Sequence, residues 1–270
     1  MAVIPDATGL PEADLQKIAR EFNFSETTFV FAPKDPKNTA RVRIFTPVNE
    51  IPFAGHPTIG TAIAIAQTTG QTDLVLELGV GPIHCKIRLG TPPQAEFTTH
   101  VPLAKMGHIS VGDAAACLGI APDHILTVNH RPEIASVGLP FTLVELKTEA
   151  ALAATFAATD SHRQAEQKYA NGIDLFAIFA YVRHGAQIKA RMFAPLSNVP
   201  EDPATGSAAA ALASYLTGIG QSPLELAIEQ GVAMGRPSTI YARTTLSDQK
   251  CDSVTIGGAA VKTLTGEFCY

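Results

Sequence analysis

Two short segments in opposite halves of the chain resemble each other, and they constrain the fold more than any other feature. Residues 57–62 read Pro-Thr-Ile-Gly-Thr-Ala, and residues 203–208 read Pro-Ala-Thr-Gly-Ser-Ala. Each segment opens an alanine-rich stretch, Pro57–Thr68 in one half and Ala204–Leu216 in the other. A helix that is apolar on every side must be buried. A chance likeness between two such helices is one interpretation; duplication, with one buried helix at the centre of each half, is the favoured one.

Around these helices the sequence alternates in the way that predicts short strands. We expect an α/β (α+β) fold with two pseudo-symmetric lobes, each a strongly curved sheet or barrel around its central apolar helix. The strand pattern yields to a linker at Pro102–Gly107, which places the first lobe at residues 1–103 and the second at 104–254, with residues 255–270 returning to the first. The predicted strands are Thr27–Phe31, Ala40–Phe45, Leu74–Leu78, His84–Arg88, Glu96–Val101, Ile134–Val137, Thr142–Leu146, Leu175–Val182, Ala186–Phe193, Leu224–Ile228, Thr239–Ala242 and Ser253–Thr263, and the remaining helices are Leu10–Phe24, Val111–Leu118, Glu149–Ala157 and Arg163–Ala170.

Composition narrows the class of protein. A length of 270 residues suits two domains, and a hydrophobic fraction of 46% with 17% charged residues suits a sizeable core. The net charge is −5 and there is no run of Lys or Arg, which argues against nucleic acid or an anionic membrane as partner. The sequence contains neither a signal-peptide pattern at its start nor an uninterrupted apolar run of membrane-spanning length. We therefore expect a cytoplasmic protein.

Several common chemistries lack their motifs in this sequence. No nucleophile elbow, zinc-protease helix, Walker loop or dinucleotide-binding glycine motif is present. The four cysteines lie far apart in sequence and form no CxxC pair, so we expect reduced thiols rather than a disulfide or metal role. They are Cys85, Cys117, Cys251 and Cys269.

The two helix starts together suggest an anion site. The first turn of a helix offers backbone N–H groups and a partial positive charge, and two such starts facing one cleft would bind an anion without an arginine. Gly55 and Gly206 allow close approach of a ligand, and Ser207 adds a hydroxyl donor. The expected ligand is a carboxylate with an acidic C–H bond nearby.

Three ionisable residues are candidates for proton transfer. His56, just before the first repeat, is either a general acid/base or a helix-capping histidine. Asp202, just before the second, is either an N-cap or a partner that orients His56 or a substrate amine. Glu26 lies between Phe24 and Phe29, and burial there would raise its pKa. From the pattern alone a solvated turn is the favoured interpretation of Glu26, and His56 is the favoured acid/base.

Four segments together resemble the phenazine-biosynthesis PhzF-like isomerase family. The resemblance implies the diaminopimelate-epimerase fold, with the active site between two similar lobes, and no metal or organic cofactor. The best-characterised members isomerise trans-2,3-dihydro-3-hydroxyanthranilate, a small carboxylate, and many are homodimers. The four segments, in the order of the family, are Asn23–Val30, Arg43–Pro57, Glu201–Ala208 and Gln230–Ser238.

The resemblance also implies a role for each site residue. In the family a glutamate takes a proton from one ring carbon and returns it to another, and its block matches at Glu26, which reverses the preference for His56 as the base. His56 and Asp202 match the substrate-contacting histidine and the aspartate, and Ser207 matches the serine. Gly55 and Gly206 match backbone positions that line the pocket.

Two departures from the family pattern qualify the prediction. Members usually begin with one more strand and a Gly-Asn-Pro turn before a segment like Ala2-Val3-Ile4, where this sequence starts. Either the start is misassigned, or the first lobe lacks an edge strand beside the pocket. The racemases of the same fold carry a cysteine at each helix start, and neither repeat here contains one, which argues against a two-thiol racemase. A catalytically silent protein that binds an aromatic or amino carboxylate is the alternative to an isomerase.

Overall fold

The computed structural model describes residues 1–169 and 176–268. Its strands are β1 (Ala2–Ile4), β2 (Thr27–Phe31), β3 (Ala40–Phe45), β4 (Glu50–Ile51), β5 (Asp73–Leu78), β6 (Gly81–Arg88), β7 (Gln94–Thr99), β8 (Ala104–His108), β9 (Glu133–Ser136), β10 (Pro140–Glu145), β11 (Ile178–His184), β12 (Gln187–Ala194), β13 (Val199–Asp202), β14 (Glu225–Gln230), β15 (Ser238–Ser247) and β16 (Lys250–Ala259). Its helices are α1 (Glu12–Phe22), α2 (Gly55–Thr69), α3 (Val111–Leu118), α4 (Glu149–Ala154), α5 (Thr159–Tyr169) and α6 (Gly206–Gly220), with short 3₁₀ turns at Pro122–His124, Pro195–Ser197 and Val232–Met234.

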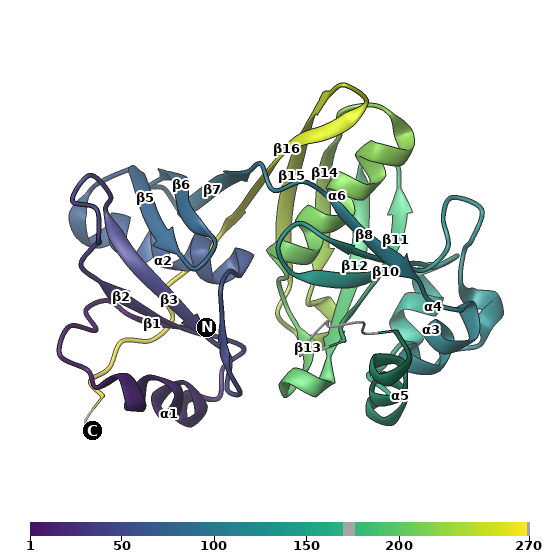
Figure 1. Ribbon diagram of the computed structural model, residues 1–270, viewed down its shortest axis with the longest axis horizontal. Coiled ribbons are helices and arrows are strands. Elements are labelled where there is room, and N and C mark those ends of the chain that lie inside the picture. Colours follow the sequence, from purple (N-terminus) through teal and green to yellow (C-terminus); the bar gives the residue numbers. More distant parts are fainter. Residues whose placement is uncertain (170–175, 269–270) are drawn as a thin grey trace.

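The strands join into one hydrogen-bonded sheet that curves through both halves of the molecule. The strand order is β1-β2-β3-β5-β6-β7-β16-β15-β14-β12-β11-β10-β9-β8, with β4 beside β3 and β13 beside β12. Figure 1 shows the two lobes, with α1, α2 and β1–β7 on the left and most later elements on the right, while β16 and the yellow C-terminal segment run back to the left. The fold is therefore a mixed α/β arrangement with a large curved sheet, as predicted.

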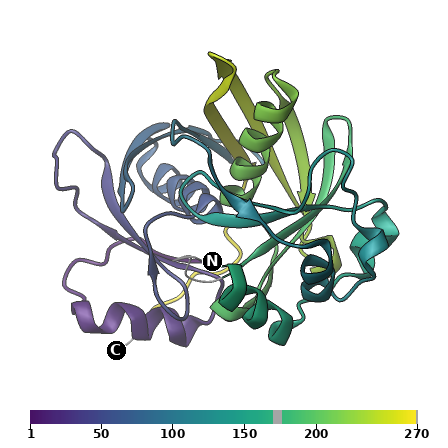
Figure 2. The ribbon, with the colours of Figure 1, turned by 45° about the vertical axis from the view of Figure 1, so that its right-hand side comes forward.

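In the first lobe the sheet lies between two helices of different character. Helix α2 is apolar on nearly every side and packs inside the curve of β5–β7, where Figure 2 shows it enclosed by those strands. Helix α1 is amphipathic, and its Leu15 and Ile18 pack on the other face of the sheet against Phe29 and Phe45. The Phe29 and Phe45 rings meet edge to face at 5.3 Å. The amphipathic pattern thus identifies the outer helix, α1, and the all-apolar pattern identifies the inner helix, α2.

The second lobe repeats this layering with more cover. Successive side chains of a strand point to opposite faces of its sheet. On β10, Leu143 therefore belongs to the core that contains α6, whereas Val144 belongs to the core built with α3, α4 and α5. The sheet is thus buried on both faces, which explains why β10 and β11 read as nearly continuous apolar runs.

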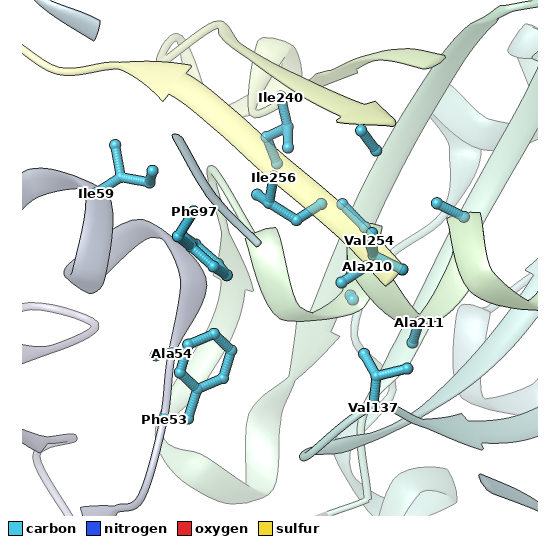
Figure 3. Packing of buried hydrophobic residues seen from close by; sticks show 14 of the residues in the cluster. Phe53, Ala54, Ile59, Phe97, Val137, Ala210, Ala211, Ile240, Val254 and Ile256 are labelled. Carbon is cyan, nitrogen blue, oxygen red and sulfur yellow. The ribbon is translucent and has the colours of Figure 1, made fainter. Parts of the chain in front are cut away.

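Strand β16 connects the lobes. It pairs antiparallel with β7 on one side and with β15 on the other. Figure 3 shows Val254 and Ile256 of β16 beside Ala210 of α6, and Phe97 of β7 beside Phe53. The rings of Phe53 and Phe97 meet edge to face at 5.4 Å. One apolar core therefore runs beneath β16 from α2 to α6.

Both all-apolar helices are buried, as predicted, but some boundaries differ. The predicted linker at Pro102–Gly107 contains strand β8, an exposed edge strand that pairs with β9. Strand β13 had no predicted counterpart. The predicted Ala170 and Leu175 ends of a helix and a strand lie outside the described residues. The division into residues 1–103 and 104–254 stays a prediction, because the sheet and the main core are continuous across it.

Candidate active site between two helix starts

The first turns of α2 and α6 meet backbone to backbone. A Cβ atom added to Gly55 would lie 2.6 Å from the Cα of Gly206, and one added to Gly206 would lie 3.0 Å from the Cα of Gly55. A Cβ atom does not fit at position 55, and one at position 206 would fit only if its neighbours moved, so the close contact strongly favours glycine at both helix starts. The approach brings two helix N-termini, with their partial positive charges, to one place. The prediction that the two helix starts face one site is confirmed.

The helices begin at Gly55 and Gly206 rather than at the prolines of the repeat. The N-cap residues are Ala54 and Thr205, and neither caps its helix with a side chain. His56 lies inside the first turn of α2, and Asp202 ends β13 before α6 begins. The interpretation of His56 and Asp202 as N-caps is therefore wrong.

His56 lies between two carboxylates that come from opposite lobes. Its Nε2 atom is 2.9 Å from Oε2 of Glu26, the residue just before β2, and its Nδ1 atom is 3.9 Å from Oδ2 of Asp202. The side chains of Glu26 and Asp202 are only 12% and 3% exposed, and that of His56 is 21% exposed. The fold thus brings together the three residues predicted for proton transfer.

The charges of Glu26, His56 and Asp202, together with burial, determine whether the pKa of each residue is raised or lowered. Burial has the largest single effect and would raise the pKa of Glu26, but the charge and close contact of His56, together with Ser25 and the N-terminal amine, lower that pKa below its ordinary value. Burial would lower the pKa of His56, but the carboxylates of Glu26 and Asp202 outweigh it and raise that pKa. Burial, supported by the charge of Glu26, raises the pKa of Asp202. Glu26 and His56 therefore form an ion pair, beside an aspartate that holds a proton more readily than usual.

The prediction that Phe24 and Phe29 surround Glu26 with apolar side chains is wrong. Phe24 is 39% exposed, and Phe29 faces the cluster under α1. The side chain of Glu26 is largely buried, so the interpretation of this residue as part of a solvated turn is wrong. Its pKa is lowered rather than raised because His56 lies beside it. The sequence did not indicate that these two residues would touch.

A small cavity of about 110 Å³ adjoins all six predicted site residues. Glu26, His56 and Asp202 line it together with Gly55, Gly206 and Ser207. Its remaining wall contains three polar residues, Thr46, Ser197 and Thr205, and is otherwise apolar, with side chains from both lobes: Ile51, Ala54, Leu139, Pro140, Phe141, Ala177, Met192, Ala194 and Val199. A wider groove of about 750 Å³ crosses the outer face of the sheet and contains none of the six.

Two oxygen atoms at this cavity are buried without a hydrogen-bond partner in the described part of the chain. They are Oε2 of Glu26, which is close to His56 but not aligned for a hydrogen bond, and Oδ1 of Asp202. Buried carboxylate oxygens are nearly always satisfied in folded proteins. Because Oε2 of Glu26 already lies in the ion pair with His56, Oδ1 of Asp202 is the oxygen that indicates a place for a donor group of a ligand.

Sequence reasoning missed two residues that support Asp202. The hydroxyl of Thr205 donates to Oδ2 of Asp202 at 2.6 Å, and the side chain of Gln230 donates to the backbone oxygen of Asp202 at 2.7 Å. Both residues stand in segments that resemble the PhzF-like family, which was the available signal.

Other groups lie away from this site. Cys85, Cys117 and Cys251 are free thiols, and burial raises the pKa of Cys85 and Cys117 to about 12; Cys269 lies outside the described residues. Within residues 1–169 and 176–268, no three His, Cys, Asp or Glu side chains are arranged to hold a metal ion. In the same ranges no helix is both long and apolar enough to span a membrane.

Comparisons with known proteins agree with this architecture. The sequence matches the family described as Phenazine biosynthesis-like protein over residues 1–266. It is 36% identical to a trans-2,3-dihydro-3-hydroxyanthranilate isomerase from Pseudomonas fluorescens, covering 97% of this chain and 90% of that protein. It is 38% identical to an uncharacterized isomerase from Mesorhizobium japonicum, covering 99% of this chain and 92% of the relative.

A solved structure shares the fold. The predicted epimerase from Pseudomonas aeruginosa superposes with a TM-score of 0.76 at 28% identity, covering 95% of this chain and 88% of that one. The protein described here is an isomerase, as its relatives are, and it belongs to the phenazine biosynthesis-like (PhzF) family.

Proposed function

We propose that this isomerase moves a proton between two carbon atoms of a small carboxylate, with Glu26 as the proton carrier and without a cofactor. The observation that carries the proposal is the Glu26–His56 ion pair beside an unsatisfied oxygen of Asp202, at a cavity that two helix starts adjoin. A proton acceptor and an anion site at one small cavity are what such a reaction needs.

The lowered pKa of Glu26 suits the first step. An ionised Glu26 accepts the proton as the substrate C–H bond breaks, and the electron pair of that bond spreads over the conjugated substrate to a second carbon. Glu26 then returns the same proton to that carbon, so no electrons are gained or lost overall. The raised pKa of His56 lets it carry a positive charge next to Glu26 and balance the charge that develops.

The substrate carboxylate would lie at the first turns of α2 and α6, held by backbone N–H groups and by the hydroxyl of Ser207. Asp202, which holds a proton readily, would contact an amine or hydroxyl of the substrate. The apolar wall suits a six-membered carbon ring. The relatives named as trans-2,3-dihydro-3-hydroxyanthranilate isomerases make a compound of that type the proposed substrate. We further propose a homodimer, as the resemblance implies, and a cytoplasmic location, as the sequence pattern predicts.

Isomerisation of that compound in D₂O, followed by NMR, tests the function. The wild-type protein should form product, and Glu26→Gln should lose about 10²–10⁴-fold in rate while still binding the substrate. His56→Gln should act chiefly by weakening or misplacing the ligand. Glu21→Gln, which changes an exposed glutamate of α1, is the matched control and should leave the rate unchanged.

The outcomes separate the alternatives. Full activity in Glu26→Gln with none in His56→Gln would show that His56 is the base. Binding of the compound by wild-type protein without isomerisation or deuterium uptake would favour the silent binding protein.

A further inference from the structure

Gln230 is fully buried beneath the segment that carries Asp202. It ends β14, and its side-chain amide contacts the neighbouring loop through both of its polar atoms. Nε2 donates to the backbone oxygen of Asp202 at 2.7 Å and to the hydroxyl of Thr205 at 2.8 Å. Oε1 accepts from the backbone N–H of Thr205 at 3.0 Å. Each contact needs the amide in this one orientation, because its donor side faces acceptors and its acceptor side faces a donor.

Thr205 passes this orientation on to the carboxylate. Its hydroxyl accepts from Gln230 and so has its own proton free to donate, which it does to Oδ2 of Asp202 at 2.6 Å. A threonine at a helix N-cap ordinarily accepts a hydrogen bond from the first turn, but Thr205 makes no such bond to α6. The hydroxyl of Thr205 therefore hydrogen-bonds to Asp202 instead of to the helix, and the first turn of α6 has no side-chain cap.

The next residue fits the same loop closely. Gly231 has a positive φ of 78°, and a Cβ atom added to it would lie 2.8 Å from the backbone oxygen of Pro203 and also clash with the backbone oxygen of Arg236. The corner made by Gln230 and Gly231 is thus packed against the loop between Asp202 and α6.

We propose that Gln230 is a positioning residue which, through Thr205, aims the carboxylate of Asp202 at the cavity and keeps the first turn of α6 open to the substrate anion. Gln230 itself does not line the cavity, so it acts through Thr205 and Asp202. The kinetic part of the test rests on the proposed function, whereas the spectroscopic part does not.

The kinetic test removes the hydrogen bonds without changing side-chain size. Gln230→Met and Thr205→Val should lower kcat by about 10²-fold, the effect of misplacing a group near the chemistry, and change KM much less. Thr205→Ser keeps the hydroxyl and should restore most of kcat. Thr217→Val is the matched control, because Thr217 is a buried threonine near the other end of α6 whose hydroxyl pairs with Thr244 at 2.7 Å. It should lower the melting temperature without changing kcat.

The spectroscopic test follows the titration of the His56 imidazole by NMR in the absence of substrate. Glu26 and Asp202 are the carboxylates that face His56, and both raise its pKa, whereas burial and the N-terminal amine lower it. In Gln230→Met and Thr205→Val the carboxylate of Asp202 should be misdirected and should raise the pKa of His56 less. The titration midpoint of His56 should therefore fall in these two variants. In Thr205→Ser and Thr217→Val the midpoint should match wild type.

The kinetic and the spectroscopic tests can each contradict a different hypothesis. An inactive wild-type protein would overturn the proposed function and leave the His56 titration to decide the role of Gln230. A midpoint in Gln230→Met and Thr205→Val that is unchanged or higher than in wild type would overturn the positioning role. So would an unchanged kcat in both variants of an active enzyme.

Discussion

Gly55 and Gly206 touch at the point where α2 and α6 begin, although they lie in opposite halves of the sequence. A Cβ atom at position 55 would lie within 2.9 Å of three backbone atoms of Gly206 and Ser207. The contact sets the spacing of the two helix starts. It follows that the width of the proposed anion site depends on the absence of two side chains.

Gly55→Ala should separate the helix starts. The added methyl group has no space, and overpacking of this kind costs about 1–3 kcal/mol in the free energy of unfolding. Turnover should fall as well, because the residues at the helix starts move apart. Gly218→Ala is the control, since Gly218 lies on α6 with open space around its Cα. It should stabilise the protein by about 0.5–1 kcal/mol. Denaturant unfolding of both variants checks this prediction, and similar effects of the two would contradict it.

Ser207→Ala should weaken the binding of a carboxylate ligand. One hydrogen bond to a charged group contributes about 1.5–3 kcal/mol, and alanine suits a helix, so the fold should be retained. Ser214→Ala changes another buried serine of α6 that does not line the cavity, and it should bind normally. Calorimetric titration with anthranilate-like acids measures both. Unchanged affinity in Ser207→Ala would place the anion elsewhere.

The ion pair of Glu26 and His56 should make stability depend on pH. The pKa of His56 is raised above its ordinary 6.5, so its stabilisation is complete below pH 6.5 and is lost as pH rises through the folded-state pKa. The pKa of Glu26 is lowered below its ordinary 4.5, so its stabilisation is present above pH 4.5 and is lost as pH falls through the folded-state pKa. Between those two ordinary values both contributions are present. The raised pKa of Asp202 acts in the opposite sense to Glu26, favouring the fold in acid.

The difference in unfolding free energy between wild type and His56→Gln should therefore be largest at mildly acid pH and shrink above pH 6.5. Urea unfolding across a pH series measures it. A gap that stays constant from about pH 5 to pH 9 would show that His56 carries no extra proton in the folded state.

Tyr181→Phe should destabilise the second lobe without affecting catalysis. The hydroxyl of Tyr181 is buried and lies 2.6 Å from Nε2 of His130. Loss of one partner leaves the other buried and unpaired, at a cost of about 1–3 kcal/mol. Tyr241→Phe alters a half-exposed tyrosine on β15 and should be neutral. Thermal unfolding compares them, and equal melting temperatures would contradict the prediction.

Features that depend on the local sequence were predicted well. The all-apolar helices and most strands follow from hydrophobic periodicity. The six predicted site residues line one cavity, and their roles stay predictions. Strand β8 was missed because all five of its residues are exposed, so it carries no alternating pattern. The repeat aligned Pro57 with Pro203, whereas contact between two helix starts made Gly55 and Gly206 the first helical residues.

Features that depend on distant contacts could not be predicted. The lowered pKa of Glu26 requires His56 beside it, and nothing in the sequence around Glu26 indicates that neighbour. The support of Asp202 by Gln230 likewise joins two segments that only the folded sheet brings together. Periodicity and motif spacing report on a single element and its immediate neighbours, whereas these contacts depend on the whole fold.

The pairing of β7 with β16 also orders events during synthesis. Strand β7 ends at Thr99, but its partner is completed only at Ala259. A nascent chain therefore exposes one edge of β7 while the whole of the second lobe is being translated, and unpaired edges promote aggregation. Closure of the sheet between the lobes joins residues far apart in sequence, which slows folding. A ribosome stalled before β16 would hold a first lobe with an open edge, a natural target for chaperones.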